Sequence, residues 1–324
     1  MQLEWRPYAF CLPRALVTSH GALERCQGWL LRLSGAAGGT GWGEAVALDR
    51  RQSAALGGVI TALGAGCSRV ELERRLPALP AALGFALGAA LAECDGLLGV
   101  RGGGWLAPPE SAQLLPAGAA ALRALEDLEP RLAEARPLTL KWKVAACDDQ
   151  QERQLLEQLL ARLPASARLR LDANGGWDRR TAEAWIERLS GEPRLQWLEQ
   201  PLAPADQAGL EALARRLPVA LDESLRQTPE LRQRWSGWQV RRPALEGDPR
   251  PLLGELQAGA PRRMLSTALE TGIGRRLVAH LAALQARGPT PVAPGLAPGW
   301  RPAGALSASD PERVWQAAAA GEQP

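Results

Sequence analysis

From residue 113 onward, short segments rich in Leu or β-branched residues alternate with longer amphipathic segments. This alternation is typical of repeated βα units, in which each helix returns the chain to the start of the next parallel strand. The candidate strands are residues 113–115, 138–144, 169–171, 196–198, 219–221, 237–240, 263–265 and 291–293. The main helices between them are expected at residues 119–135, 150–163, 179–189, 206–217 and 274–285. Eight strands without a GxGxxG motif after the first favour an α/β fold of the TIM-barrel type over an open Rossmann sheet.

The residues before this region have a different pattern. Two alternating stretches, residues 2–12 and 28–33, predict antiparallel strands joined by a loop that includes His20. Residues 52–98 carry apolar side chains at helical spacing. The predicted organisation is an α+β domain over residues 1–103, a barrel domain over residues 104–301, and a tail over residues 302–324 that packs back on the first domain.

The charge balance and the cysteines exclude several classes of protein. There are 38 basic and 35 acidic residues, so bulk charge predicts no nucleic-acid partner. The five cysteines form no CxxC pair and predict neither a disulfide framework nor a zinc site, so a reducing cytoplasm is the expected location. The amino terminus does not resemble a signal peptide, and the uncharged stretch at residues 76–92 is short and contains two prolines. We therefore expect no membrane insertion, while the oligomeric state is left open.

Lysine occurs at only two positions, Lys141 and Lys143, among the 38 basic residues. An arginine does not lose its proton in a protein, whereas a buried lysine can act as a base. The alternative is that the pair is a chance remnant, but two random lysines would fall two residues apart only about once in 160 trials. Both lie on one predicted strand, where residues two apart share a face, and Trp142 points to the other face. The pair is therefore a candidate catalytic group.

Further polar side chains follow the next strands at the point where each strand ends. They are Asp172 with Asn174, then Glu199, Asp222 with Glu223, and Arg242, at intervals of 20 to 29 residues from the lysine pair onward. Each interval is about the length of one βα unit. Because the carboxyl ends of barrel strands converge on one mouth, these side chains are expected to share a small volume.

The three carboxylates Asp172, Glu199 and Asp222 offer hard oxygen ligands from three consecutive strands. Such ligands suit Mg²⁺, with Mn²⁺ as an alternative, whereas zinc would favour His or Cys. Taken singly, each carboxylate is more simply explained as a helix cap or as the partner of an arginine. Caps do not require acidic residues in register on consecutive strands, so the set predicts a metal site.

A lysine beside a divalent cation points to proton abstraction from carbon. The α-proton of a small carboxylate substrate is too weakly acidic for an amine unless a bound cation stabilises the resulting enediolate. Lys143 must be neutral for this role. Burial, the neighbouring Lys141 and the metal all lower the pKa of its ammonium.

The motifs at these positions resemble those of the enolase superfamily, and within it those of the o-succinylbenzoate synthases. They are the segments 141–143 (KWK), 171–174 (LDAN), 198–201 (LEQP), 221–224 (LDES) and 266–272 (STALETG). Residues 41–44 (GWGE) and the helical segment 85–97 extend the similarity over nearly the whole chain.

The resemblance implies an N-terminal α+β capping domain over a modified (β/α)₇β barrel, with the three carboxylates as Mg²⁺ ligands and Lys143 as acid and base. It also implies dehydration of 2-succinyl-6-hydroxy-2,4-cyclohexadiene-1-carboxylate to 2-succinylbenzoate, a step of menaquinone or phylloquinone biosynthesis. The residues then expected to contact the substrate are Asn174, Ser266, Thr267, Gly295 and His20.

One departure from the family concerns Arg242, which precedes Pro243 where a second lysine is usual. A racemase needs a second base, and a guanidinium cannot serve as one. A syn elimination needs only Lys143, and Arg242 would remain as a cation over the substrate ring. Dehydration is therefore favoured. The alternatives are an enzyme like muconate cycloisomerase or N-succinylamino acid racemase, or an inactive barrel used as a binding scaffold.

Overall fold

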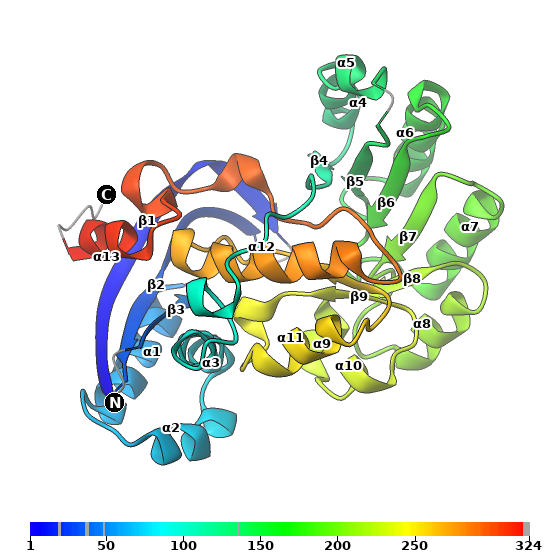
Figure 1. Cartoon of the computed structure of the whole chain (residues 1–324). Helices are drawn as coiled ribbons and strands as arrows, with labels where there is room; N and C mark the ends of the chain where they lie inside the picture. Colours follow the sequence, from blue (N-terminus) through cyan, green and yellow to red (C-terminus); the bar gives the residue numbers. More distant parts are fainter. Residues whose placement is uncertain (19–20, 36–38, 48, 135, 320–324) are drawn as a thin grey trace. The chain divides into compact units, whose positions relative to one another are not determined.

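An antiparallel sheet and a parallel sheet organise the chain (Figure 1). The computed structural model describes all residues except 19–20, 36–38, 48, 135 and 320–324. The described chain divides into two compact units. The first comprises residues 1–109, 242–261 and 265–324, and the second comprises residues 110–241 and 262–264. The domain bounds expected at residues 103 and 301 stay a prediction.

The first unit contains the antiparallel sheet, in the order β1-β2-β3. Its strands are β1 (Gln2–Thr18), β2 (Gly21–Ser34) and β3 (Thr40–Ala47), and its first helices are α1 (Arg50–Leu63), α2 (Arg69–Arg75) and α3 (Ala81–Cys94). The hairpin is longer than expected, because its pairing continues past a register shift to the pair Thr18 and Gly21. The loop residue His20 lies outside the described residues.

Strand β3 packs closely on helix α3 through two glycines. A side chain at Gly41 or Gly43 would place its Cβ within about 2 Å of the carbonyl oxygens of Ala90 or Ala86, respectively. The helix supplies small residues at these points and is buried along most of its length. The close contact explains why both glycines of the segment 41–44 are needed.

The remaining helices of this unit come from the C-terminal part of the chain. They are α11 (Arg250–Gln257), α12 (Gly272–Arg287) and α13 (Pro311–Ala319). The 3₁₀ turns of the whole unit are Leu76–Ala78, Val100–Gly102, Pro243–Leu245, Pro298–Trp300 and Gly304–Ser307. Helix α13 packs on β1. Arg6 of β1 donates from Nη1 to the Trp315 carbonyl at 2.8 Å, and its guanidinium lies 4.4 Å from the centroid of that indole. The C-terminal helix is thus held on the N-terminal sheet.

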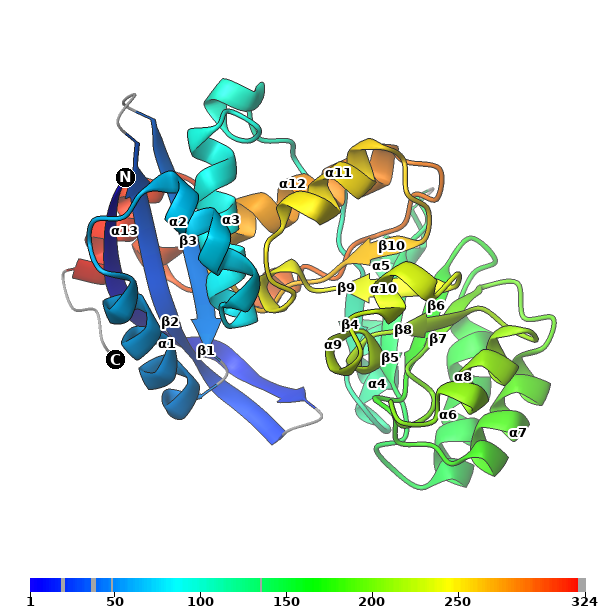
Figure 2. The same ribbon diagram turned by 90° about the horizontal axis from the view of Figure 1, so that it is seen from below.

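The second unit is built on the parallel sheet, whose strand order is β10-β9-β8-β7-β6-β5-β4 (Figure 2). The strands are β4 (Gln113–Leu115), β5 (Thr139–Lys143), β6 (Arg168–Asp172), β7 (Leu195–Glu199), β8 (Val219–Leu221), β9 (Trp238–Arg241) and β10 (Arg263–Leu265). The helices are α4 (Ala120–Glu126), α5 (Glu129–Leu132), α6 (Asp149–Arg162), α7 (Arg179–Leu189), α8 (Gln207–Ala214), α9 (Glu223–Gln227) and α10 (Leu231–Arg234). Sequential strands are neighbours, as in a barrel sheet.

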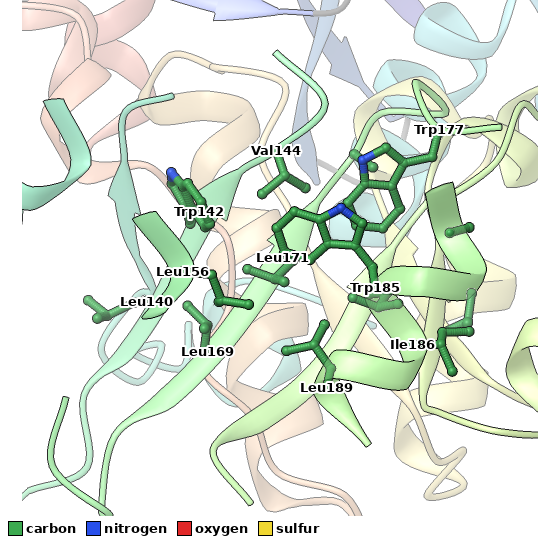
Figure 3. Packing of buried hydrophobic residues seen from close by; sticks show 14 of the residues in the cluster. Leu140, Trp142, Val144, Leu156, Leu169, Leu171, Trp177, Trp185, Ile186 and Leu189 are labelled. Atoms are coloured by element: carbon green, nitrogen blue, oxygen red, sulfur yellow. The ribbon is translucent and has the colours of Figure 1, made fainter. Parts of the chain in front are cut away.

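One face of this sheet is apolar and packs against the helices. Figure 3 shows Trp142 of β5 and Leu171 of β6 in the same layer as Trp185 of α7. All three side chains are fully buried. Because alternate residues of a strand point to opposite faces, this packing leaves the residues between them for the other face.

Two expected elements differ in the structure. Residues 291–293 form no strand, and the chain makes a single bridge from Ser266 to Gly295 instead. Pro291 and Pro294 have no N–H to donate to a ladder, which explains the missing strand. The helix expected over residues 119–135 is divided into α4 and α5, with a proline in the first turn of α5. None of the described helices is long and apolar enough to span a bilayer.

Candidate active site

The lysine pair lies on the polar face of the parallel sheet, at the carboxyl end of β5. Lys141 and Lys143 are half-buried, whereas Trp142 between them is fully buried in the apolar layer. Lys143 lies beside Asp172 in the parallel pairing of β5 with β6. The predicted alternation therefore places both amines on the face that carries the strand-end carboxylates.

Lys141 connects two of these carboxylates. Its Nζ lies 2.8 Å from Asp172 Oδ2 and 2.5 Å from Glu199 Oε1. The third carboxylate, Asp222, follows β8 and lies 3.6 Å from the Arg226 guanidinium. All three acidic residues are at most 4% exposed. Three strands thus deliver three buried carboxylates to one edge of the sheet.

Burial of these like charges has an electrostatic cost, which is seen at Glu199. Desolvation raises the pKa of this carboxyl to about 7, with further increases from Asp172 and Asp222 and opposition from Lys141. The positive charge of Lys141 therefore only partly compensates the negative charge around Glu199.

The environment of Lys143 makes it a candidate base. Burial lowers the pKa of its ammonium below the ordinary lysine value, and Lys141 lowers it further, while Asp172 opposes the shift. The neutral amine is therefore more accessible near neutral pH than for a solvated lysine.

Asn174 and Glu223 form a hydrogen-bonded pair next to Asp172. Asn174 has a left-handed backbone conformation with φ of 45°, and its backbone N–H donates to Asp172 Oδ1 at 3.1 Å. Its Nδ2 donates to Glu223 Oε1 at 3.1 Å. Glu223 follows Asp222 among the polar strand-end residues that the sequence indicated, but no role in the site was predicted for it.

Gln200 is a residue that the sequence prediction missed. Its Oε1 accepts from the backbone N–H groups of Asp222 and Ser224 at 3.2 and 3.0 Å, and its Nε2 donates to Ser224 Oγ at 2.8 Å. The side chain is fully buried. Gln200 therefore fixes the end of β8 relative to the end of β7, where Glu199 precedes it.

Comparison with known proteins shows which family the chain belongs to. Residues 123–236 match the family model described as "Enolase C-terminal domain-like". The o-succinylbenzoate synthase of Thermosynechococcus vestitus is 36% identical over 299 residues, which cover 87% of this chain and 88% of that protein. The chain belongs to the o-succinylbenzoate synthase family, a family of lyases in the enolase superfamily.

Solved structures agree with this assignment. The structure of o-succinylbenzoate synthase from Thermosynechococcus elongatus BP-1, complexed with Mg in the active site, matches with a TM-score of 0.80 and 30% identity. The match covers 98% of this chain and all of that chain. The L-Ala-D/L-Glu epimerase of Bacillus subtilis matches with a TM-score of 0.69 at 22% identity, which shows the fold alone. The predicted architecture of a capping domain and a modified (β/α)₇β barrel is confirmed.

The strand-end residues fit a divalent cation in donor chemistry and in charge. Asp172, Glu199 and Asp222 present hard carboxylate oxygens. Burial raises the pKa of Glu199, and repulsion from Asp172 and Asp222, which a cation would relieve, raises it further. Within the part of the chain that the structure describes, no three His, Cys, Asp or Glu side chains form a ready-made metal-binding group. The Lys141 ammonium contacts two of the three carboxylates in this arrangement.

Four further predicted residues, Arg242, Ser266, Thr267 and Gly295, lie in the first unit. Arg242 donates from Nη1 to the Thr267 carbonyl at 2.9 Å. Gly295 O accepts from the Thr267 backbone N–H at 3.0 Å and from Ser266 Oγ at 3.3 Å. The structure thus brings these four residues together in one unit, and Asn174 lies with the lysines and carboxylates in the other.

The first unit also contains a buried carboxylate whose role the sequence did not reveal. Glu44 of β3 accepts hydrogen bonds at the start of α12, from the backbone N–H groups of Thr271 and Gly274 at 2.8 Å each and from Thr271 Oγ1 at 2.6 Å. It therefore acts as a cap that comes from another element.

Proposed function

We propose that this enzyme catalyses the syn dehydration of 2-succinyl-6-hydroxy-2,4-cyclohexadiene-1-carboxylate to 2-succinylbenzoate. The observation that carries the proposal is a lysine with a lowered pKa at the same strand-end edge as three buried carboxylates, in a chain 36% identical to an o-succinylbenzoate synthase. In this function the enzyme belongs to menaquinone or phylloquinone biosynthesis.

Asp172, Glu199 and Asp222 would hold Mg²⁺, and Mn²⁺ is an alternative metal. The bound cation would stabilise the negative charge that develops on the substrate carboxylate when the α-proton leaves. Lys141 is charged and contacts Asp172 and Glu199, so it keeps a positive charge beside Lys143. That charge favours the neutral form of the Lys143 amine.

Lys143 would carry the proton through the elimination. Its neutral Nζ removes the α-proton, and the resulting ammonium returns that proton to the departing hydroxyl on the same side of the ring. One C–H and one C–O bond break, a ring double bond forms, and water leaves. One amine is sufficient for both transfers, so the reaction needs no second base.

Arg242 and its neighbours would bind the rest of the substrate. The Thr267 carbonyl holds the Arg242 guanidinium, which would act as a fixed cation over the ring. We assign Ser266, Thr267, Gly295 and the loop residue His20 to the succinyl end, and Asn174 to substrate binding. A cytoplasmic location is also proposed, and the five free cysteines support it.

Ultraviolet absorbance of the aromatic product tests this proposal directly. Purified protein with Mg²⁺ and the cyclohexadiene substrate should form 2-succinylbenzoate, and EDTA should stop the reaction until excess Mg²⁺ is added. Absence of product formation with intact Mg²⁺ binding would reject the dehydratase assignment.

An epimerase or cycloisomerase remains the second candidate, because an L-Lys-D/L-Arg epimerase of Methylococcus capsulatus is 34% identical over 167 residues. Arg242 argues against an epimerase, since the guanidinium cannot be the second base that epimerisation needs. Deuterium incorporation at the α-carbon of a succinylamino acid, without dehydration of the cyclohexadiene, would favour that candidate.

A further inference from the structure

Glu199 receives a different hydrogen-bond donor on each carboxylate oxygen. Oε1 accepts from Lys141 Nζ at 2.5 Å, and Oε2 accepts from the indole Nε1 of Trp197 at 3.4 Å. Trp197 lies two residues earlier on β7, so both side chains share one face of the sheet. Both are fully buried. The orientation of the carboxylate is therefore fixed from two sides.

The Trp197 ring is itself held in place. The guanidinium of Arg170 lies 4.1 Å from its centroid, and the Trp238 ring lies 4.8 Å away at an angle of 31°. Arg170 donates from Nε to Gln196 Oε1 at 2.8 Å. These contacts leave the indole N–H little freedom to turn away from Glu199.

The β6–β7 pairing explains how this arrangement arises. The register shifts between Leu169 and Arg170, so that Leu169 pairs with Leu195 whereas Arg170 pairs with Trp197. The extra residue on β7 is Gln196, and it receives the Arg170 hydrogen bond. The irregularity places a cation and an indole side by side, directly before the paired Asp172 and Glu199.

We propose that Trp197 is a positioning residue, whose indole N–H keeps the Glu199 carboxylate in the orientation needed to bind a divalent cation. The inference rests on the proposed function. Groups that hold a metal-ligating side chain from behind set its direction, and their loss typically weakens metal binding by about 10- to 100-fold. An indole N–H can only donate, so it suits a carboxylate that must remain charged.

Calorimetric titration with Mg²⁺ tests this role without any substrate. Trp197→Phe keeps an aromatic ring in the stack and removes only the donor. We expect its Mg²⁺ affinity to fall by about tenfold or more. Trp185→Phe is the matched control, because Trp185 is also fully buried and donates from Nε1 to a carboxylate, Asp149, at 2.6 Å. Its Mg²⁺ affinity should equal that of the unmodified enzyme.

A spectroscopic measurement separates positioning from a general loss of packing. In protein labelled with ¹⁵N at the indoles, the Trp197 N–H signal is identified by its absence from Trp197→Phe. This signal should shift when Mg²⁺ is added, while the Trp185 signal stays in place. Should Trp197→Phe fail to fold, Trp238→Leu removes one stacking partner instead, and it should still weaken Mg²⁺ binding.

The outcomes are distinguishable. If the unmodified enzyme does not bind Mg²⁺, the proposed function is wrong. If it binds Mg²⁺ and the Trp197→Phe affinity is unchanged, the proposed function survives and the positioning role is rejected. In the case where only Trp238→Leu folds, an unchanged affinity rejects it equally.

Discussion

Two groups of buried carboxylates in the described part of the chain differ in what holds their negative charge. In the first unit, backbone amides and a hydroxyl donate to Glu44, while Thr267 Oγ1 and the Ala268 amide donate to Glu270. In the second unit, Asp172 and Glu199 share the side-chain ammonium of Lys141. Fixed amides complete a structural cap, whereas an ammonium leaves oxygens that a metal can take. The comparison teaches that burial of an acid does not identify its role, but the kind of partner does.

Replacement of Lys143, the proposed base, should produce the largest loss of activity of the changes considered. Lys143→Ala is expected to lower turnover by about 10²- to 10⁴-fold, because Lys143 is the residue proposed to move the α-proton. The rate of aromatisation measures this. Arg168→Ala, at the opposite end of β6, is the control and should keep its rate. A Lys143→Ala enzyme with normal turnover would remove the chemical basis of the proposal.

Replacement of Glu44, the cap of α12, should lower the free energy of unfolding and leave the catalytic step unchanged. Glu44→Ala leaves the N–H groups of Thr271 and Gly274 and the Thr271 hydroxyl without their acceptor, at a cost of about 1–3 kcal/mol each. We expect the free energy of unfolding to fall by at least about 3 kcal/mol. Urea denaturation measures it. An unchanged value would show that water replaces the carboxylate freely.

Mg²⁺ should stabilise the folded protein through the carboxylates of the second unit, and Glu44 should not contribute to this effect. At a concentration 100 times its dissociation constant, a ligand specific to the folded state adds about 2.7 kcal/mol of stability. Thermal unfolding with and without Mg²⁺ should show this increment for the unmodified enzyme and for Glu44→Ala, but not for Asp222→Asn. An equal increment in Asp222→Asn would place the cation elsewhere.

The activity should depend on pH through the protonation of Lys143. Lys143 must lose its proton before it acts, so kcat/KM should rise with pH along a limb whose pKa lies below the ordinary lysine value. Replacement of Lys141 by Gln removes a neighbouring positive charge, so the limb should move to higher pH. Initial rates across the pH range measure this limb in the unmodified enzyme and in Lys141→Gln. A limb that stays in place in Lys141→Gln would mean that the two amines do not interact.

The smallest effect is expected at Arg242. Lys retains the positive charge, and a cation over an aromatic or conjugated ring contributes about 0.5–2 kcal/mol. Arg242→Lys should therefore keep its rate within about tenfold, which corresponds to 1.4 kcal/mol. The same aromatisation assay measures it, with Arg242→Ala as the comparison. An inactive Lys variant would show that the planar guanidinium has a more specific task.

The sequence indicated which strand-end residues lie side by side, because their positions depend on local period and spacing. Alternation along β5 places Lys141 and Lys143 on one face, and the lengths of the βα units bring Asp172 and Glu199 beside them. Local pattern failed where prolines intervened, at residues 291–293 and in the divided helix over residues 119–135. A proline removes a hydrogen-bond donor without interrupting the hydrophobic pattern that suggested the element.

Strand periodicity in the sequence indicated which face of each strand is polar, and side-chain chemistry made Lys143 the predicted base and excluded Arg242. The partner of each buried group depends on the three-dimensional fold. Glu44 meets the start of α12 more than 200 residues further along the chain, and Trp197 meets Arg170 because the strand pairing shifts by one residue. The physical reason is that hydrogen bonds and ring contacts depend on positions fixed to within an ångström by long-range packing, whereas periodicity fixes only the face on which a side chain lies.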